Sequence, residues 1–128
     1  MAWYKATVST DGSGDGTNLT NGRPVWSGNF YGFLMGVRLD FSGSAAAGSD
    51  TTLTEINGLQ RTLVSLTDTN TDTTLNPQIE ITDNAGTGKA SYSPAIVDSA
   101  NLKVTVAQGG ATVTDHVAVF VEILEVEA

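Results

Sequence analysis

The amino-acid sequence predicts one all-β domain spanning residues 1–128: an antiparallel β-sandwich or jelly-roll-like fold of about seven or eight strands. Three observations support this prediction. Threonine and valine are abundant whereas good helix formers are sparse. Apolar and polar residues alternate in several segments, and clusters of glycine, asparagine, aspartate and serine separate those segments. The length is sufficient for a single hydrophobic core.

The first predicted strand is residues 4–8, followed by a polar connection over residues 9–24. The clearest strand is the segment 30–41, in which every odd-numbered residue from Tyr31 to Phe41 is apolar. Residues 51–56 and 61–66 are expected to form a hairpin across Asn57-Gly58, which is a strong turn dipeptide. This alternation predicts that one face of each strand is buried.

Three later segments complete the expected set of strands: residues 78–82, 101–107 and 116–126. In the first of them, Ile79 and Ile81 are expected to point inward. The last segment is apolar on both faces, which predicts a central or covered strand. The residues expected to be largely buried are Tyr31, Phe33, Val37, Leu39, Leu102, Val104, Val106, Val119 and Val121.

The connection over residues 9–24 is rich in glycine, serine, threonine and asparagine, which predicts a flexible loop able to contact a neighbouring subunit. Asp11, Ser13 and Asp15 alternate as at the start of an EF-hand, but no bidentate glutamate follows at the required distance. A calcium site built from Asp11, Asp15 and backbone carbonyls remains an alternative, as does a weak site at Asp68 and Asp72. We predict no metal and no cofactor.

Few residues in the chain could perform catalysis. There is no cysteine, and the single histidine, His116, has no nucleophile to activate. Most carboxylates lie in predicted turns, and no nucleotide-binding, zinc or nucleophile-elbow motif occurs. The formal net charge of −8 and the lack of a basic cluster argue against nucleic-acid binding. We therefore predict that the protein is not an enzyme and binds neither nucleic acid nor membranes.

Four segments together resemble small virion structural proteins of tailed bacteriophages, in order and spacing: residues 9–16, 62–86, 102–111 and 116–123. The chain departs from that pattern at residues 75–78, where the relatives favour an aromatic residue and an arginine. The resemblance implies a non-enzymatic capsid decoration or cement protein that binds the major capsid protein lattice and stabilises the head. It also implies a homotrimer on the capsid surface of the virion, made in the host cytoplasm.

Aromatic side chains are enriched at the centres of protein interfaces, so the candidate partner contacts include several of them. With the two loop aspartates, these candidates are Trp3, Tyr4, Asp11, Asp15, Trp26 and Phe30. The alternative for each aromatic residue is a place in the core. Two other functions stay open: a carbohydrate-binding module with Trp26 and Tyr31 as a platform, and a tail or neck accessory protein.

Overall fold

The computed structural model describes residues 2–20, 23–26, 31–56, 60–98 and 102–125. These residues form antiparallel β-sheets and contain no helix, which confirms the all-β prediction. In consequence, the described residues include no helix of the length and apolarity needed to cross a membrane.

The larger sheet, sheet A, is built on the long central strand β5 (Tyr31–Phe41). The last strand, β13 (Val117–Glu125), lies between β5 and the first strand, β1 (Ala2–Val8). Two short strands, β8 (Thr73–Leu75) and β11 (Ile96–Asp98), pair with β5 on its other side. Val37 pairs with Leu75 and Phe33 with Ile96, so β8 and β11 lie in line along the same edge of β5.

The second sheet, sheet B, has the strand order β2-β12-β6-β7. Its strands are β2 (Gly16–Thr17), β12 (Leu102–Ala107), β6 (Asp50–Glu55) and β7 (Thr62–Leu66). The antiparallel pairing of β6 with β7 confirms the expected hairpin, whereas the Asn57-Gly58 turn lies outside the described residues. Two smaller sheets pair β3 (Leu19–Thr20) with β4 (Arg23–Pro24), and β9 (Ile79–Thr82) with β10 (Gly88–Ser93).

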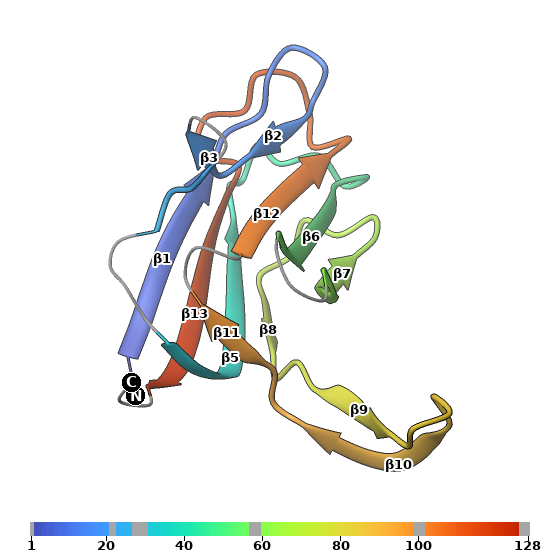
Figure 1. Cartoon of the computed structure of the whole chain (residues 1–128). Coiled ribbons are helices and arrows are strands. Elements are labelled where there is room, and N and C mark those ends of the chain that lie inside the picture. Colours follow the sequence, from blue (N-terminus) through green and yellow to red (C-terminus); the bar gives the residue numbers. More distant parts are fainter. Residues whose placement is uncertain (1, 21–22, 27–30, 57–59, 99–101, 126–128) are drawn as a thin grey trace.

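Sheets A and B share one hydrophobic core, because buried side chains of β1, β5 and β13 form one cluster with those of β6, β7 and β12. Figure 1 shows the arrangement of these strands. Burial of each aliphatic side chain contributes about 1.5–3 kcal/mol relative to exposure. The expected burial of seven aliphatic residues from β5, β12 and β13 is confirmed, since each is at most 1% exposed: Val37, Leu39, Leu102, Val104, Val106, Val119 and Val121.

The strand β5 carries a β-bulge that changes which side chains face the core. Glu122 pairs with Gly36, but the next residue, Ile123, pairs with Leu34, so Met35 is an extra residue on β5. Because side chains alternate with a period of two, this insertion reverses the faces on one side of the bulge. Leu34 is therefore fully buried and Phe33 only half-buried. The prediction of a buried Phe33 is wrong, and the side chain of Tyr31 lies outside the described residues.

The described part of the connection after β1, where the sequence predicts a flexible loop over residues 9–24, makes backbone hydrogen bonds to distant parts of the chain. Thr10 N donates to Val113 O at 3.0 Å, and Thr112 N donates to Asp11 O at 2.7 Å. Further along, β2 pairs with β12 of sheet B. The connection is long because it crosses from one large sheet to the other, which a short hairpin turn could not do.

The first strand is also part of the body rather than a reaching segment. All seven residues of β1 pair with β13, and Ala6 and Val8 belong to the buried residues. Asn18, which follows β2, is buried, and its Oδ1 accepts a hydrogen bond from Val104 N at 2.6 Å. We therefore expect removal of residues 1–20 to unfold the domain.

Candidate protein-interaction surfaces

A two-stranded hairpin projects from the body of the molecule (Figure 1). It consists of β9, β10 and the turn between them, and we call residues 79–93 the arm. Every residue from 80 to 92 except Asp83 is exposed. Two large apolar side chains are among them: Ile81 is 47% exposed and Tyr92 is 58% exposed. The arm thus exposes apolar surface to water on a segment that extends away from the core.

The turn at the tip of the arm is fixed by the carboxylate of Asp83. Its Oδ1 accepts hydrogen bonds from Ala85 N at 2.9 Å and Thr87 N at 3.0 Å, and Asp83 N donates to Thr87 O at 3.0 Å. Lys89 Nζ lies 3.3 Å from the other carboxylate oxygen. The hydrogen bonds from Thr87 N and Ala85 N hold the pKa of Asp83 below its usual value. Local turn chemistry, and not a core, shapes this end of the arm.

The two exposed apolar residues of the arm point to opposite faces. Tyr92 pairs with Glu80, whereas Ser93 pairs with Ile79, so Tyr92 shares a face with Glu80 and not with Ile79 or Ile81. Ile79 is half-buried and contacts the main core. The prediction that Ile81 also points inward is wrong, because β9 leaves the body directly after Ile79.

A second apolar surface lies on the outer face of sheet A, the face turned away from the core. Trp3, in β1, is 54% exposed and Leu124, in β13, is 44% exposed. Lys5 pairs with Phe120, and its Nζ lies 5.6 Å from the centre of the Phe120 ring, within the range of a cation–π interaction. We call these four residues the outer patch.

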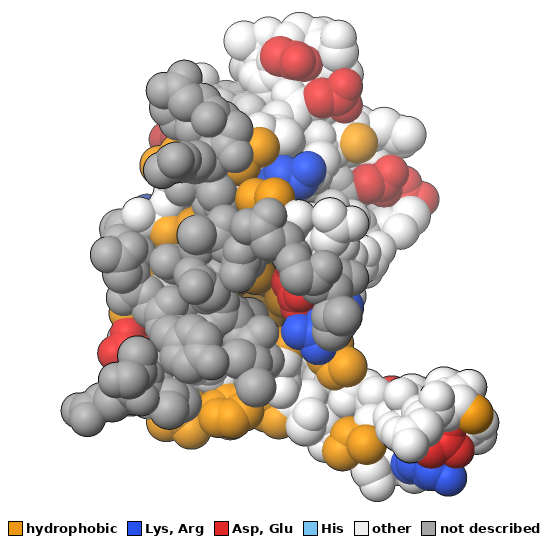
Figure 2. All heavy atoms as spheres, viewed as in Figure 1, with side chains coloured by type: hydrophobic (Ala, Val, Ile, Leu, Met, Phe, Trp, Pro, Cys, Tyr) orange, Lys and Arg blue, Asp and Glu red, His pale blue; other side chains and the backbone are white. Residues whose placement is uncertain are grey.

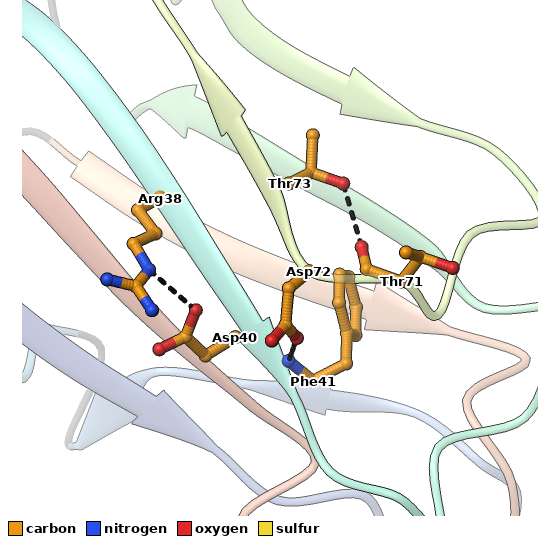
Figure 3. A network of polar contacts seen from close by, with 6 residues as sticks. All are labelled: Arg38, Asp40, Phe41, Thr71, Asp72 and Thr73. Carbon is orange, nitrogen blue, oxygen red and sulfur yellow. Dashed lines mark hydrogen bonds and ion pairs between the residues drawn. The ribbon is translucent and has the colours of Figure 1, made fainter.

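Three polar contacts on and beside this face are drawn in Figure 3. Arg38 and Asp40, two residues apart on β5, form an ion pair with Nε 2.8 Å from Oδ1. Asp72 Oδ1 accepts a hydrogen bond from Phe41 N at 2.8 Å, and the Thr73 hydroxyl donates to Thr71 O at 2.7 Å (Figure 3). The contacts of Asp72 and Thr73 fix the chain as it enters β8 along the edge of β5.

The end of the molecule opposite the start of β1 is acidic. There, residues 9–16 lie against residues 108–116, and we call these two segments the apex loops. Asp11, Asp15 and Asp115 are exposed in them, and neither segment contains lysine or arginine. Figure 2 shows carboxylate side chains in red over this upper end. Such a surface repels a second acidic surface.

Asp11 shapes its turn as Asp83 does, so its carboxylate has a structural role. Asp11 Oδ1 accepts hydrogen bonds from Ser13 N at 2.8 Å and Asp15 N at 3.2 Å, and Asp11 N donates to Asp15 O at 2.8 Å. Across the described ranges, no three histidine, cysteine or acidic side chains converge on a point where they could hold a metal ion. The alternating aspartates of this segment are thus explained by turn geometry.

His116 is a fully buried residue beneath the apex loops. The Ser49 hydroxyl donates to Ala46 O at 2.6 Å, so its oxygen accepts the hydrogen of His116 Nε2 at 3.0 Å. The ring also meets Phe41 edge-on, with the ring centres 5.8 Å apart. Burial lowers the pKa of His116 and favours the neutral ring. A substrate in solution has no access to it.

The partner-contact candidates chosen from sequence do not lie on one surface. Trp3 belongs to the outer patch near the start of β1, whereas Asp11 and Asp15 lie in the apex loops beyond the other end of β1, which is roughly 17 Å away. Tyr4 faces inward, is half-buried and contacts Glu125 through its hydroxyl. Trp26 is also half-buried against the core, and its Nε1 donates to Leu102 O at 3.4 Å. Phe30 lies outside the described residues.

The arm is the surface that sequence reasoning missed. Its second strand, with the sequence GKASYS, contains one large apolar residue and therefore has no alternating apolar pattern. The available signal was the repeated spacing Asp-x-x-Gly-x, found at 11–15 and again at 83–87. Comparison with protein-family models, curated proteins and solved structures found no match for this chain.

Proposed function

We propose that this protein is a non-enzymatic virion structural protein, a capsid decoration protein that binds the major capsid protein lattice and stabilises the head. The observation that carries the proposal is the arm. A two-stranded hairpin alone is at best marginally stable in water, and this one exposes a large apolar side chain on each face. Contact with another protein would bury both side chains and stabilise the arm.

The body supports the same proposal. Its two sheets and shared core suit a β-sandwich with jelly-roll-like connections, which gives the arm a rigid base. The outer patch supplies a second contact surface, because an exposed tryptophan is typical of interface centres. The four segments that resemble phage virion proteins add support from sequence alone. A carbohydrate platform at Trp26 is disfavoured, because this side chain contacts the core.

Imaging of intact particles tests the proposal. Particles that carry the protein are expected to show its density at regular positions on the capsid surface. Density confined to the tail or neck, or no binding to capsids, would reject capsid decoration and favour the accessory alternative.

A binding experiment adds a test of the arm. In the shortened variant, residues 80–92 are replaced by Asn-Gly, which joins the paired residues Ile79 and Ser93 through a two-residue turn. Particles lacking the protein are incubated with this variant or with a matched control, Ser65→Ala, in the exposed part of the edge strand β7. The shortened variant is expected to fold and to lose capsid occupancy, whereas the control keeps it. Equal occupancy would show that the arm does not bind the lattice.

A further inference from the structure

We propose that the arm of one copy docks through its Tyr92 face onto the outer patch of a second copy, in a head-to-tail contact. This inference rests on the proposed function, to which it adds the chain itself as a partner of the arm. A single chain presents two exposed apolar surfaces, one on the arm and one on the outer face of sheet A, and one contact between copies would cover both.

The arm cannot be covered by its own body. It leaves the edge of sheet A between β8 and β11 and projects away from both large sheets (Figure 1). The outer patch is formed by β1 and β13, which lie on the other side of β5 from β8 and β11. Two different surfaces that meet between copies make a heterologous contact, and such contacts form closed rings when the rotation between copies allows it.

Charge favours the outer face of sheet A over the apex loops as the surface that a second copy contacts. At a net charge of −8 the copies repel one another in general. Among the described outward side chains of β1, β13 and β5, two cations (Lys5 and Arg38) balance two carboxylates (Asp40 and Glu122), whereas the apex loops carry carboxylates alone. The outer face of sheet A is therefore a surface that an acidic chain can approach.

The outer patch carries a cation, and the Tyr92 face of the arm carries a carboxylate, that can form an ion pair across this contact. Arg38 is already paired with Asp40. Lys5 and Glu80 form no ion pair within the described parts of the chain; Glu80 accepts only a long hydrogen bond of 3.4 Å from Ala90 N. Glu80 shares its face with Tyr92, and Lys5 lies two residues from Trp3 on the same face of β1. Docking therefore places Tyr92 against Trp3 and Leu124, with Glu80 near Lys5.

Cross-linking tests this arrangement directly, because the chain has no cysteine of its own. The single variants Lys5→Cys and Glu80→Cys are mixed and oxidised; both retain the aromatic residues of the contact. A disulfide requires the two Cα atoms to lie within about 7 Å of each other. We expect a disulfide-linked dimer from this mixture and little from the matched mixture of Lys5→Cys with Ile81→Cys, which places the thiol on the opposite face of the arm. Equal yields from the two mixtures would overturn the proposal.

The oligomeric state provides a second test. Sedimentation of the unmodified protein at about 100 µM, well above the micromolar range of weak specific contacts, is expected to show a species larger than the monomer. Tyr92→Ser and Trp3→Ser should each weaken association about tenfold, while Ile81→Ser leaves it unchanged. Circular dichroism verifies that each variant is folded. A monomeric unmodified protein, or an equal effect of Ile81→Ser, contradicts the inference.

Exchanging the charges of Lys5 and Glu80 tests whether these two residues pair across the contact. Lys5→Glu and Glu80→Lys alone should each weaken association about threefold, and the double variant should recover it. Failure of the double variant to recover association would overturn the assigned pair. All these measurements use protein without particles. Normal capsid occupancy by a monomeric protein would reject only this inference, whereas oligomers that do not bind capsids would reject the proposed function.

Discussion

The apex and the arm contain the same five-residue turn in different surroundings. In both, an aspartate Oδ1 accepts two backbone N–H groups, and the fourth residue is a glycine with a φ of 82°. At the apex, a Cβ on Gly14 would lie 3.2 Å from Gly110 N, whereas a Cβ on Gly86 in the arm would have nothing within 4 Å. The sequence of the turn determines its shape. Whether the turn belongs to the body depends on whether another segment of the same chain packs against it, as Gly110 does at the apex.

This difference implies two levels of stability in one chain. The body unfolds only when its core is exposed, whereas the arm has few buried contacts and can open locally. The predictions below compare changes in the body with matched changes in the arm.

The largest difference is expected for a charge placed in each region. Val104→Asp puts a carboxylate at a position that is fully buried in β12, which destabilises the fold by several kcal/mol and should abolish soluble expression. Ile81→Asp puts the same group on the exposed arm and should change the unfolding free energy by less than about 0.5 kcal/mol. Thermal unfolding and solubility measure both. An equally damaging Ile81→Asp would place the arm inside the cooperative unit.

Alanine at the two turn glycines should separate the surroundings of the turns. Each substitution forces an L-residue to a positive φ, at about 1–2 kcal/mol. Gly14→Ala also crowds the backbone of Gly109 and Gly110, so we expect its melting temperature to fall by roughly 5–10 °C. Gly86→Ala should leave the melting temperature of the body nearly unchanged. Equal losses would mean that the arm turn is coupled to the body.

Between pH 7.5 and pH 5, the effect of pH on stability should be confined to the body, since its His116 is the only histidine of the chain. Burial lowers the pKa of His116 in the folded state below the ordinary value of 6.5. As the pH falls below that value, the unfolded state binds the proton first, so the unfolding free energy decreases until the folded pKa is reached. Melting scans between pH 7.5 and pH 5 measure the slope. His116→Leu should flatten it, and an unchanged slope would assign the effect to other groups.

The smallest effect is expected at the tip of the arm. Asp83→Ala removes the acceptor of two backbone N–H groups, so hydrogen exchange at Ala85 and Thr87 should accelerate while the melting temperature stays constant. Because the folded pKa of Asp83 is lowered, the turn should also loosen in the original protein as the pH falls below about 3.8 and the carboxylate is protonated. Exchange measured by NMR across that range checks both expectations. Unaltered exchange in the variant would show that the turn does not depend on the carboxylate.

The sequence allowed prediction where the apolar pattern is regular. Leu102, Val104 and Val106 alternate with the polar residues Lys103 and Thr105, and their burial follows from this alternation alone. The pattern failed at Phe33, because the β-bulge at Met35 reverses the faces and single-sequence periodicity contains no sign of an unpaired residue. It failed at Ile81 for a different reason: the pattern shows which side chains share a face but not where a strand leaves the core.

The candidate contact surfaces were less predictable than the fold. Trp3 was expected at an interface and lies on an exposed face, but nothing in the sequence separated it from Trp26, which contacts the core. Glycine-rich composition predicted a flexible connection at residues 9–24. In fact the glycines allow close approach, as at Gly14, and the connection is ordered by hydrogen bonds to residues distant in sequence. Long-range pairing of this kind has no local signal.

The alignment of β8 and β11 along one edge of β5 has a consequence for how such a protein can change over time. The two strands occupy the positions of a single edge strand, and residues 76–95 interrupt it. An ancestor without that insertion would have kept most of the core side chains of the two sheets. The insertion can therefore lengthen, shorten or be exchanged between lineages while the host domain stays intact. Among relatives, we expect the domain of two sheets to be retained and residues 76–95 to vary with the partner protein that they bind.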